Sequence, residues 1–221
     1  MKRCIGVAVA VLTLAGCKTP LSRPAIPLPS MTTEQLAAAV AADARRSDLE
    51  MDSKIRAQLA ADALQNAQAC LDRAPQAVDC LYYDGVALGL NARAHPLQAN
   101  DALKSMLEAL SRAEAADPAY DQAGPARVKA LVLIKAPAWP LGPGDAEAGL
   151  AAARRAVALR PDYPPNVLAL AEALAKTGDT QGAQDAYRHA RDLIQALPPS
   201  RDRDDWQHQA DQALGKSSAP H

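Results

Sequence analysis

The chain has no Phe, and it has only five Tyr and two Trp among its 221 residues. Aromatic and β-branched residues favour strands, whereas alanine, which is abundant here, is the best helix former. Hydrophobic residues still make up 49% of the chain, which is enough for one sizeable core. The composition therefore predicts an all-α domain with closely packed backbones.

The chain also lacks an excess of positive charge and any familiar catalytic motif. Its 24 basic residues nearly balance its 25 acidic residues, which argues against a nucleic-acid partner. No G-x-S-x-G, H-E-x-x-H or phosphate-loop pattern occurs. The four histidines are scattered, without the spacing of metal ligands: His95, His189, His208 and His221. We therefore expect no enzymatic activity, no cofactor and no metal.

No apolar run in the first part of the chain is long enough to cross a bilayer. Residues 5–14 are largely apolar and follow Lys2-Arg3, but a spanning helix needs about 20 such residues. They fit a secretory signal, and the sequence Leu-Ala-Gly-Cys at 14–17 resembles a bacterial lipobox. That resemblance implies a lipoprotein signal peptide at 1–16 and lipid attachment at Cys17. A plain signal peptide with an incidental cysteine is the alternative.

Residues 17–30 contain four prolines and predict a stiff spacer. An extended chain of this length reaches about 40 Å. Residue 18 is Lys rather than the Asp that favours inner-membrane retention in the better-known Gram-negative sorting scheme. We therefore expect the periplasmic face of the cell envelope, in the outer membrane, with the lipid as the membrane contact.

A repeated pattern begins further along the chain. Three times a small residue stands five positions before a proline that stops a helix: Cys70/Pro75, Ala113/Pro118 and Ala156/Pro161. After Pro161, small residues at 171, 183 and 190 alternate with Leu174 and Tyr187. This spacing resembles the tetratricopeptide repeat, a 34-residue helix–turn–helix. The resemblance implies a solenoid of three to four degenerate helix pairs, with extra terminal helices, over residues 31–215; residues 216–221 are expected to be a disordered tail.

Two of the repeat units are longer than usual. Pro75, Pro118 and Pro161 are 43 residues apart, nine more than the ordinary period. We expect the extra length between the paired helices, near 91–99 and 137–145. The same frame places Gly85 and Val128 at the small position of their first helices. Insertions on one side of a solenoid often form its functional face.

Residues 116–157 resemble a narrower group, the repeat lipoproteins of the T component of TRAP transporters. The matching residues are Asp117, Pro118, Tyr120, Asp121, Gly124, Pro125, Ala136, Pro137, Trp139, Pro140, Gly144 and Asp145. The resemblance implies a lipid-anchored periplasmic protein that works with a substrate-binding partner in ligand uptake. The N-terminal third of the chain carries no motif of this group.

Cys70 and Cys80 are separated by ten positions and lie on either side of a turn that contains Pro75. Because a periplasmic chain can keep disulfides, we predict that these two cysteines are bonded. Two independent half-buried thiols are the alternative. Cys4 lies in the predicted signal peptide and needs no role.

Eight residues are candidate contacts for a ligand or partner. Seven occupy first-helix positions that line the concave surface of such a solenoid, and the eighth belongs to the 137–145 insertion: Tyr82, Val86, Leu90, Lys129, Leu133, Leu168, Glu172 and Trp139. Apolar residues with one Lys and one Glu suit a peptide or a small amphipathic ligand. In the alternative, they pack against a capping helix or the insertions, and Trp139 is a buried anchor.

Together these features predict a non-catalytic protein that binds a partner protein or a ligand. It would serve either as a scaffold for envelope proteins or as an accessory of TRAP-type uptake beside a substrate-binding protein.

Overall fold

The computed structural model describes residues 28–217 and is almost entirely helical in that range. This part of the chain contains nine α-helices, two short 3-10 helices and no β-strand. A single β-bridge pairs Ala138 with Gly144. The predicted all-α class is confirmed. Residues 1–27, which include Cys17 and most of the predicted spacer, lie outside the described residues.

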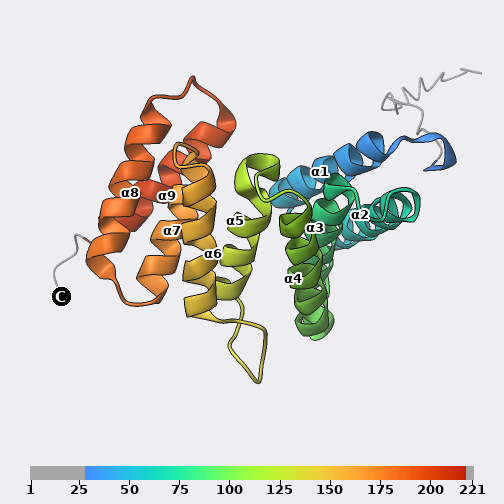
Figure 1. The fold of residues 1–221 in the computed structure, drawn as a ribbon, viewed down its shortest axis with the longest axis horizontal. Helices are drawn as coiled ribbons and strands as arrows, with labels where there is room; N and C mark the ends of the chain where they lie inside the picture. The colour runs from blue at the N-terminus through green and yellow to red at the C-terminus, as the bar shows by residue number, and fades with distance from the viewer. Residues whose placement is uncertain (1–27, 218–221) are drawn as a thin grey trace, which may run out of the picture.

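The helices pack as consecutive pairs, with α9 beside the last of them (Figure 1). They are α1 (Thr33–Leu49), α2 (Ser53–Arg73), α3 (Val78–Ala94), α4 (Ala99–Ala116), α5 (Tyr120–Lys135), α6 (Ala146–Leu159), α7 (Pro164–Lys176), α8 (Thr180–Gln195) and α9 (Arg201–Ser217). The short helices are η1 (Leu28–Ser30) and η2 (Pro96–Gln98). Four pairs and one terminal helix agree with the predicted helical-repeat solenoid.

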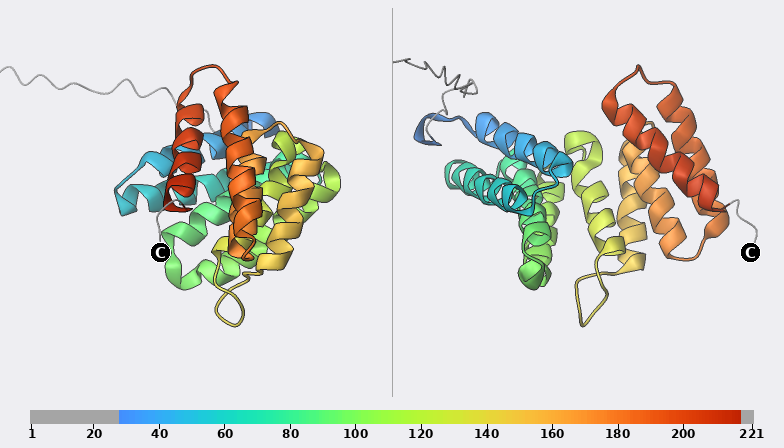
Figure 2. Two further views of the ribbon diagram at one scale, coloured as in Figure 1. Left: turned by 90° about the vertical axis from the view of Figure 1, so that its left-hand side faces the viewer. Right: turned by 180° about the vertical axis from the view of Figure 1, so that it is seen from behind.

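The pairs do not all point the same way. Helices α5 to α9 stand side by side, whereas α1 and α2 lie across them at the other end of the molecule (Figures 1 and 2). Helices α3 and α4 join the two parts. Within residues 28–217, no helix combines the length and the apolar character that crossing a bilayer requires.

Local signals in the sequence explain where the helices begin and end. The Gln35 backbone N–H donates to Thr32 Oγ1 and the Thr32 N–H donates to Gln35 Oε1, so a capping box begins the first helix. Pro75, Pro118 and Pro161 each follow the last residue of a helix closely, as the repeat pattern predicts.

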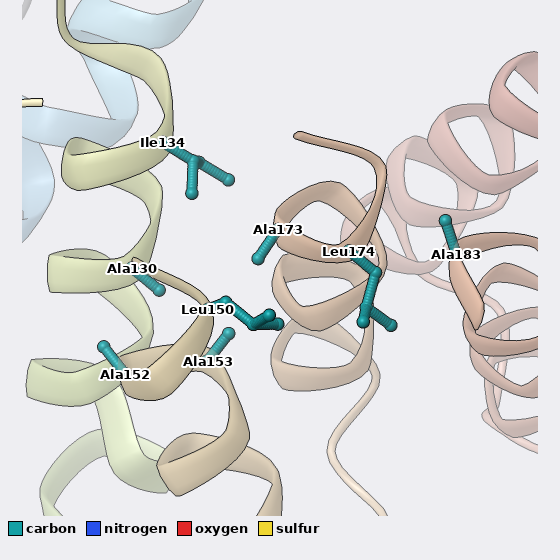
Figure 3. Packing of buried hydrophobic residues seen from close by; sticks show 8 residues of the cluster. All are labelled: Ala130, Ile134, Leu150, Ala152, Ala153, Ala173, Leu174 and Ala183. Carbon is teal, nitrogen blue, oxygen red and sulfur yellow. The ribbon is translucent and has the colours of Figure 1, made fainter. Parts of the chain in front are cut away.

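Small residues allow the paired helices to approach one another. A Cβ atom at Gly85 would lie 2.9 Å from Leu110 Cγ on α4, and one at Gly149 would lie 2.6 Å from Ile134 Cγ2 on α5. Figure 3 shows the core around α5 to α8, in which alanines fill the contact between helices and Leu150 reaches toward α7. The interaxial distance depends on the side chains at the crossing, so alanine-rich faces give close packing.

The repeat frame is displaced in the third pair. The frame predicted that Val128 would take the small position against the second helix, but Ala130 lies in the core between α5 and α6. Asp121, Gln122 and Ala123 have positive φ angles of 47°, 55° and 64°. This left-handed turn precedes the right-handed part of α5. The residue of α5 that packs against α6 is therefore Ala130, two positions later than the repeat frame predicted.

The two insertions take different forms. The one predicted near 91–99 is absorbed mainly by helix: α3 and α4 have 17 and 18 residues, compared with 13 and 16 in α7 and α8. The one predicted near 137–145 is a projecting loop between α5 and α6 (Figure 1). Continued hydrogen bonding accommodates extra residues in the first case, while Pro137, Pro140 and Pro143 prevent a helix in the second.

The end of α2 is joined to the start of α3 by Cys70 and Cys80. Their Cα atoms are 5.3 Å apart and their sulfurs are at bonding distance. Both side chains are buried beside Leu36 of α1. The predicted pairing is confirmed, and the alternative of two separate thiols does not describe this site.

The last helix extends further than the sequence indicated. Helix α9 ends at Ser217, so it includes the first two residues of the predicted tail, 216–221. Residues 218–221 lie outside the described residues.

Candidate functional site

A hollow lies among the described residues between α3 and α4 on one side and α5 on the other. Its volume is about 960 Å³, which is in the range of small-molecule sites. We call it the central groove. Its lining residues are Ala44, Asp48, Val86, Gly89, Leu90, Ala92, Arg93, Ala99, Leu103, Met106, Val128, Leu131, Val132, Lys135, Ala136 and Pro137.

The groove lies along α5. Near the start of α5, the Tyr82 hydroxyl on α3 donates to Asp121 Oδ2 at 2.7 Å. Further along α5, Val128 and Val132 line the groove together with Met106 of α4. The walls are therefore mostly aliphatic side chains and small residues, which favour an apolar ligand or segment.

Three charged residues line the groove, Asp48, Arg93 and Lys135, and each of them is paired. Arg93 Nη1 lies 2.8 Å from Asp48 Oδ1. Lys135 Nζ lies 2.9 Å from Glu172 Oε2. The groove lining includes no Ser, Thr, Cys, His or Tyr.

Lys135 also borders a second, smaller hollow of about 350 Å³. This hollow lies beside Glu172, Ala175 and Tyr187 at the ends of α5 and α7. Burial, together with the Glu172 carboxylate, raises the pKa of Tyr187 to about 12. Tyr187 therefore remains a neutral hydroxyl at physiological pH, and Lys135 is a charge shared by two adjacent hollows.

At the other end of α5, a polar network holds the left-handed turn of residues 121–123. Arg127 is its centre: Nη2 donates to Asp121 Oδ2 at 3.0 Å, and Nη1 lies within 3.2 Å of the carbonyl oxygens of Asp121 and Gln122. The guanidinium also lies 5.2 Å from the centre of the Tyr163 ring. Non-glycine residues rarely adopt positive φ, so these contacts stabilise a turn that costs free energy.

Asn166 connects this turn to the next helix pair and is 0% exposed. Its Nδ2 donates to the carbonyl oxygens of Gln122, Ala156 and Arg160, and its Oδ1 accepts from Arg127 at 3.1 Å. One side chain thus satisfies groups from α5, α6 and the turn before α7. The network fixes the end of α5 from which the groove opens.

Tyr82 and Gly124 complete the network on the side of α3. Burial, with the Asp121 carboxylate beside it, raises the pKa of Tyr82, whose hydroxyl therefore stays protonated and donates. A Cβ at Gly124 would lie 2.8 Å from both Asp121 Oδ2 and the Tyr82 hydroxyl oxygen. Only glycine leaves room for this hydrogen bond at the start of the right-handed helix.

The structure brings two of the eight predicted contact residues, Val86 and Leu90, into the central groove. Tyr82 is buried in the polar network instead. Lys129 is not free for a ligand, because its Nζ lies 2.8 Å from Glu114 Oε2, and Arg155 pairs with the same carboxylate. Burial in cores and ion pairs explains these placements, which first-helix position alone does not indicate.

The remaining four lie elsewhere. Leu133 packs toward Gly149 on α6. Leu168 is only 2% exposed and packs near Trp206 of α9, so packing against a capping helix describes its place better than a contact surface. Glu172 borders the smaller hollow and accepts from Gln209 of α9. Trp139 is 87% exposed on the α5–α6 loop, so the buried-anchor alternative is wrong.

Several groove residues were not among the predicted contacts. Leu103 and Met106 belong to a second helix, α4, which we had not considered as a lining element. Val128 and Val132 lie on α5, one helical turn apart. A spacing of four residues on a helix places two side chains on the same face. Nothing in the local sequence indicates that the helices packed opposite this face leave it partly uncovered.

Three potential metal-ligating residues lie together among residues 28–217: Cys70, Asp79 and Cys80, with donor atoms within 4.8 Å of one another. The two sulfurs are bonded to each other and offer no thiolate. This cluster is therefore explained by the disulfide.

Comparison with known proteins adds no family to these observations. No protein-family model matches the sequence, and no curated protein is significantly similar to it.

Proposed function

We propose that this chain is a lipid-anchored helical-repeat protein of the periplasmic face that binds an apolar ligand or segment in the central groove without catalysis. The observation that carries the proposal is the groove itself: about 960 Å³, with mostly aliphatic walls and lining charges that are paired. The lipobox motif supports the anchor, because it combines a cationic start, a short apolar run and a cysteine.

The groove also bears on the choice between the two functions that the sequence left open. A scaffold for envelope proteins needs only exposed faces, whereas an accessory of TRAP-type uptake needs a hollow for its ligand and a substrate-binding partner. The groove favours a ligand-binding function. The resemblance around residues 116–157 supports the accessory version, and recovery of a periplasmic substrate-binding protein with the anchored chain is the result that would favour it.

Acylation at Cys17 is the first expected result. The chain expressed with its own signal is expected to be in the membrane fraction, with Cys17 as its acylated first residue. Intact-mass and peptide mass spectrometry measure both properties. The matched variant Cys17→Ala is expected to lose processing and acyl groups. Recovery of a soluble chain cut at another residue would contradict the anchor.

Ligand binding in the groove is tested by what copurifies with the protein. Membranes are solubilised with a copolymer in place of detergent, and small molecules extracted from the purified protein are quantified by mass spectrometry. Leu103→Gln places an amide in the apolar wall, and an amide without a partner costs about 1–3 kcal/mol, so we expect roughly a tenfold loss of bound apolar molecule.

Leu107→Gln is the matched control, because it is the same change one turn further along α4 at a half-buried residue that is not in the groove lining. It is expected to retain the copurifying molecule. Equal retention by both variants, each folded by circular dichroism, would show that the groove is not the binding site.

A further inference from the structure

The large hydrophobic side chains that are strongly exposed within residues 28–217 all lie where the first helix of a pair turns into the second. They are Leu49, Met51 and Ile55 at the α1–α2 turn, Leu97 at the α3–α4 turn, and Trp139 and Leu141 in the α5–α6 loop. We call this set the apolar edge. Within the described residues, the turns that lead from one pair to the next contain none of them.

Two of these turns project at the same end of the molecule. The α3–α4 turn and the α5–α6 loop extend to the lower side in all three views (Figures 1 and 2). The α1–α2 turn is held beside the last turn of α3, because Arg93 pairs with Asp48 at 2.8 Å. The groove lining adjoins both projecting tips through Ala99 and Pro137. Leu97, Trp139 and Leu141 of the apolar edge therefore lie on two tips that project at one end of the molecule and adjoin the groove lining.

Backbone hydrogen bonds hold the α5–α6 loop in a defined conformation. The Gly144 N–H donates to the Pro137 carbonyl at 2.8 Å, and the Asp145 N–H donates to the Leu133 carbonyl at 2.9 Å. A Cβ at Gly142 would lie 2.6 Å from the Pro137 carbonyl oxygen, so the two sides of the loop are in close contact. The hydrogen bonds hold the loop closed, while Trp139 and Leu141 are 87% and 78% exposed.

We propose that the two projecting tips of the apolar edge, which carry Leu97, Trp139 and Leu141, insert into the interface of a phospholipid bilayer. These side chains stand on two separate turns that extend to the same side, and a planar, deformable apolar phase contacts both at once. The indole of Trp139 has an apolar body and a polar N–H, which suits the boundary between headgroups and acyl chains. Surface patches of this kind on soluble domains mark protein or membrane contacts.

The charges beside these side chains decide the kind of lipid surface. Residues 136–144 contain no charged side chain; at the α1–α2 turn, Glu50 and Asp52 flank Met51, and Lys54 and Arg56 flank Ile55, so two acids balance two bases. The Glu50 carboxylate accepts the Asp52 N–H, and the Asp52 carboxylate caps α2. Because the edge has no surplus of positive charge, its contact is with uncharged or zwitterionic lipid and does not depend on salt.

Fluorescence of Trp139 tests this contact directly. The full chain, purified from membranes as the Trp206→Phe variant so that Trp139 is its only tryptophan, is reconstituted into phosphatidylcholine vesicles with or without brominated acyl chains. Bromine quenches only nearby indoles. We expect brominated lipid to quench the emission of Trp139 and the emission maximum to lie at shorter wavelength than in the protein without vesicles. Equal emission in both kinds of vesicle would overturn the proposal.

Trp139→Phe is the matched control, because it leaves Trp206, whose ring packs 5.9 Å from that of Tyr163. Its emission is expected to be the same in both vesicles. Leu141→Asp in the single-tryptophan protein is expected to reduce the quenching, and added salt is expected to leave it unchanged. Quenching that requires anionic lipid and disappears in salt would overturn an apolar contact.

This inference rests on the proposed function only in that the lipid anchor brings the bilayer near. Mass spectrometry of Cys17 distinguishes a failure of the anchor from a failure of the membrane contact. An acylated chain without quenching retains the anchor and overturns the membrane contact. A chain without acyl groups that still binds vesicles with quenching overturns the anchor and supports the contact. A chain without acyl groups that does not bind vesicles overturns both.

Discussion

Replacing Asn166 with alanine is expected to lower the free energy of unfolding by about 3 kcal/mol. The side chain is 0% exposed and has four hydrogen-bond partners: the two N–H groups of Nδ2 are shared among three carbonyl oxygens, and Oδ1 accepts from Arg127. Alanine removes these hydrogen bonds and leaves a cavity that the rigid helix ends cannot fill. The left-handed turn of residues 121–123 loses the hydrogen bond from Asn166 to Gln122. In this variant, the backbone amides of the turn are therefore expected to exchange with solvent faster than the backbone amides of α2.

Urea unfolding, followed by circular dichroism, measures the change in stability. Asn66→Ala is the matched control, because it is the same substitution at a half-buried position on α2, and we expect it to change the stability by less than about 1 kcal/mol. Equal stability of the two variants would show that the Asn166 network contributes little to holding α5, α6 and α7 together.

Removing the disulfide is expected to lower the free energy of unfolding by nearly as much as Asn166→Ala does. Changing both Cys70 and Cys80 to serine opens a loop of ten-residue separation, and the expected loss in the free energy of unfolding is about 2–3 kcal/mol. The bond restricts the unfolded chain, and in the folded protein it ties the end of α2 to the start of α3 beneath Leu36. The loss is measured by urea unfolding of the double variant against the wild type.

Thiol titration of the unfolded, unreduced protein tests the bond itself. The processed chain is expected to show no titratable thiol, because Cys17 is acylated and Cys4 is removed with the signal peptide. Two free thiols that map to Cys70 and Cys80 would contradict the disulfide. One that maps to Cys17 would contradict the anchor alone, so the two outcomes are distinguishable.

Local features of the sequence were sufficient for the helical class, several helix ends and the disulfide. The capping box at Thr32 and Gln35 and the three spaced prolines depend on residues near one another in the chain. The small position at Gly85 was predictable for the same reason, since a repeat places equivalent residues at equivalent contacts. The Cys70–Cys80 pair is also local, because one turn separates the two helix ends.

The repeat frame was wrong where the backbone departs from common conformations. Asp, Gln and Ala at 121–123 take positive φ angles, and no residue in that stretch marks a left-handed turn as glycine would. The turn is held by Tyr82, Arg127 and Asn166, which come from α3, α5 and α7. Such support from distant segments cannot be derived from the spacing within one helix.

The central groove and the exposure of Trp139 were decided by the tertiary structure. Periodicity identifies the apolar face of each helix, but the distance between α5 and the α3–α4 pair depends on contacts at the far end of α5 and on the length of α3 and α4. An apolar side chain on a first helix can therefore end in the core, as Leu168 does beneath α9, or in the groove wall, as Val128 does. By itself the sequence determined which residues avoid water; tertiary packing decided which of them another helix covers, because that depends on residues far apart in the chain.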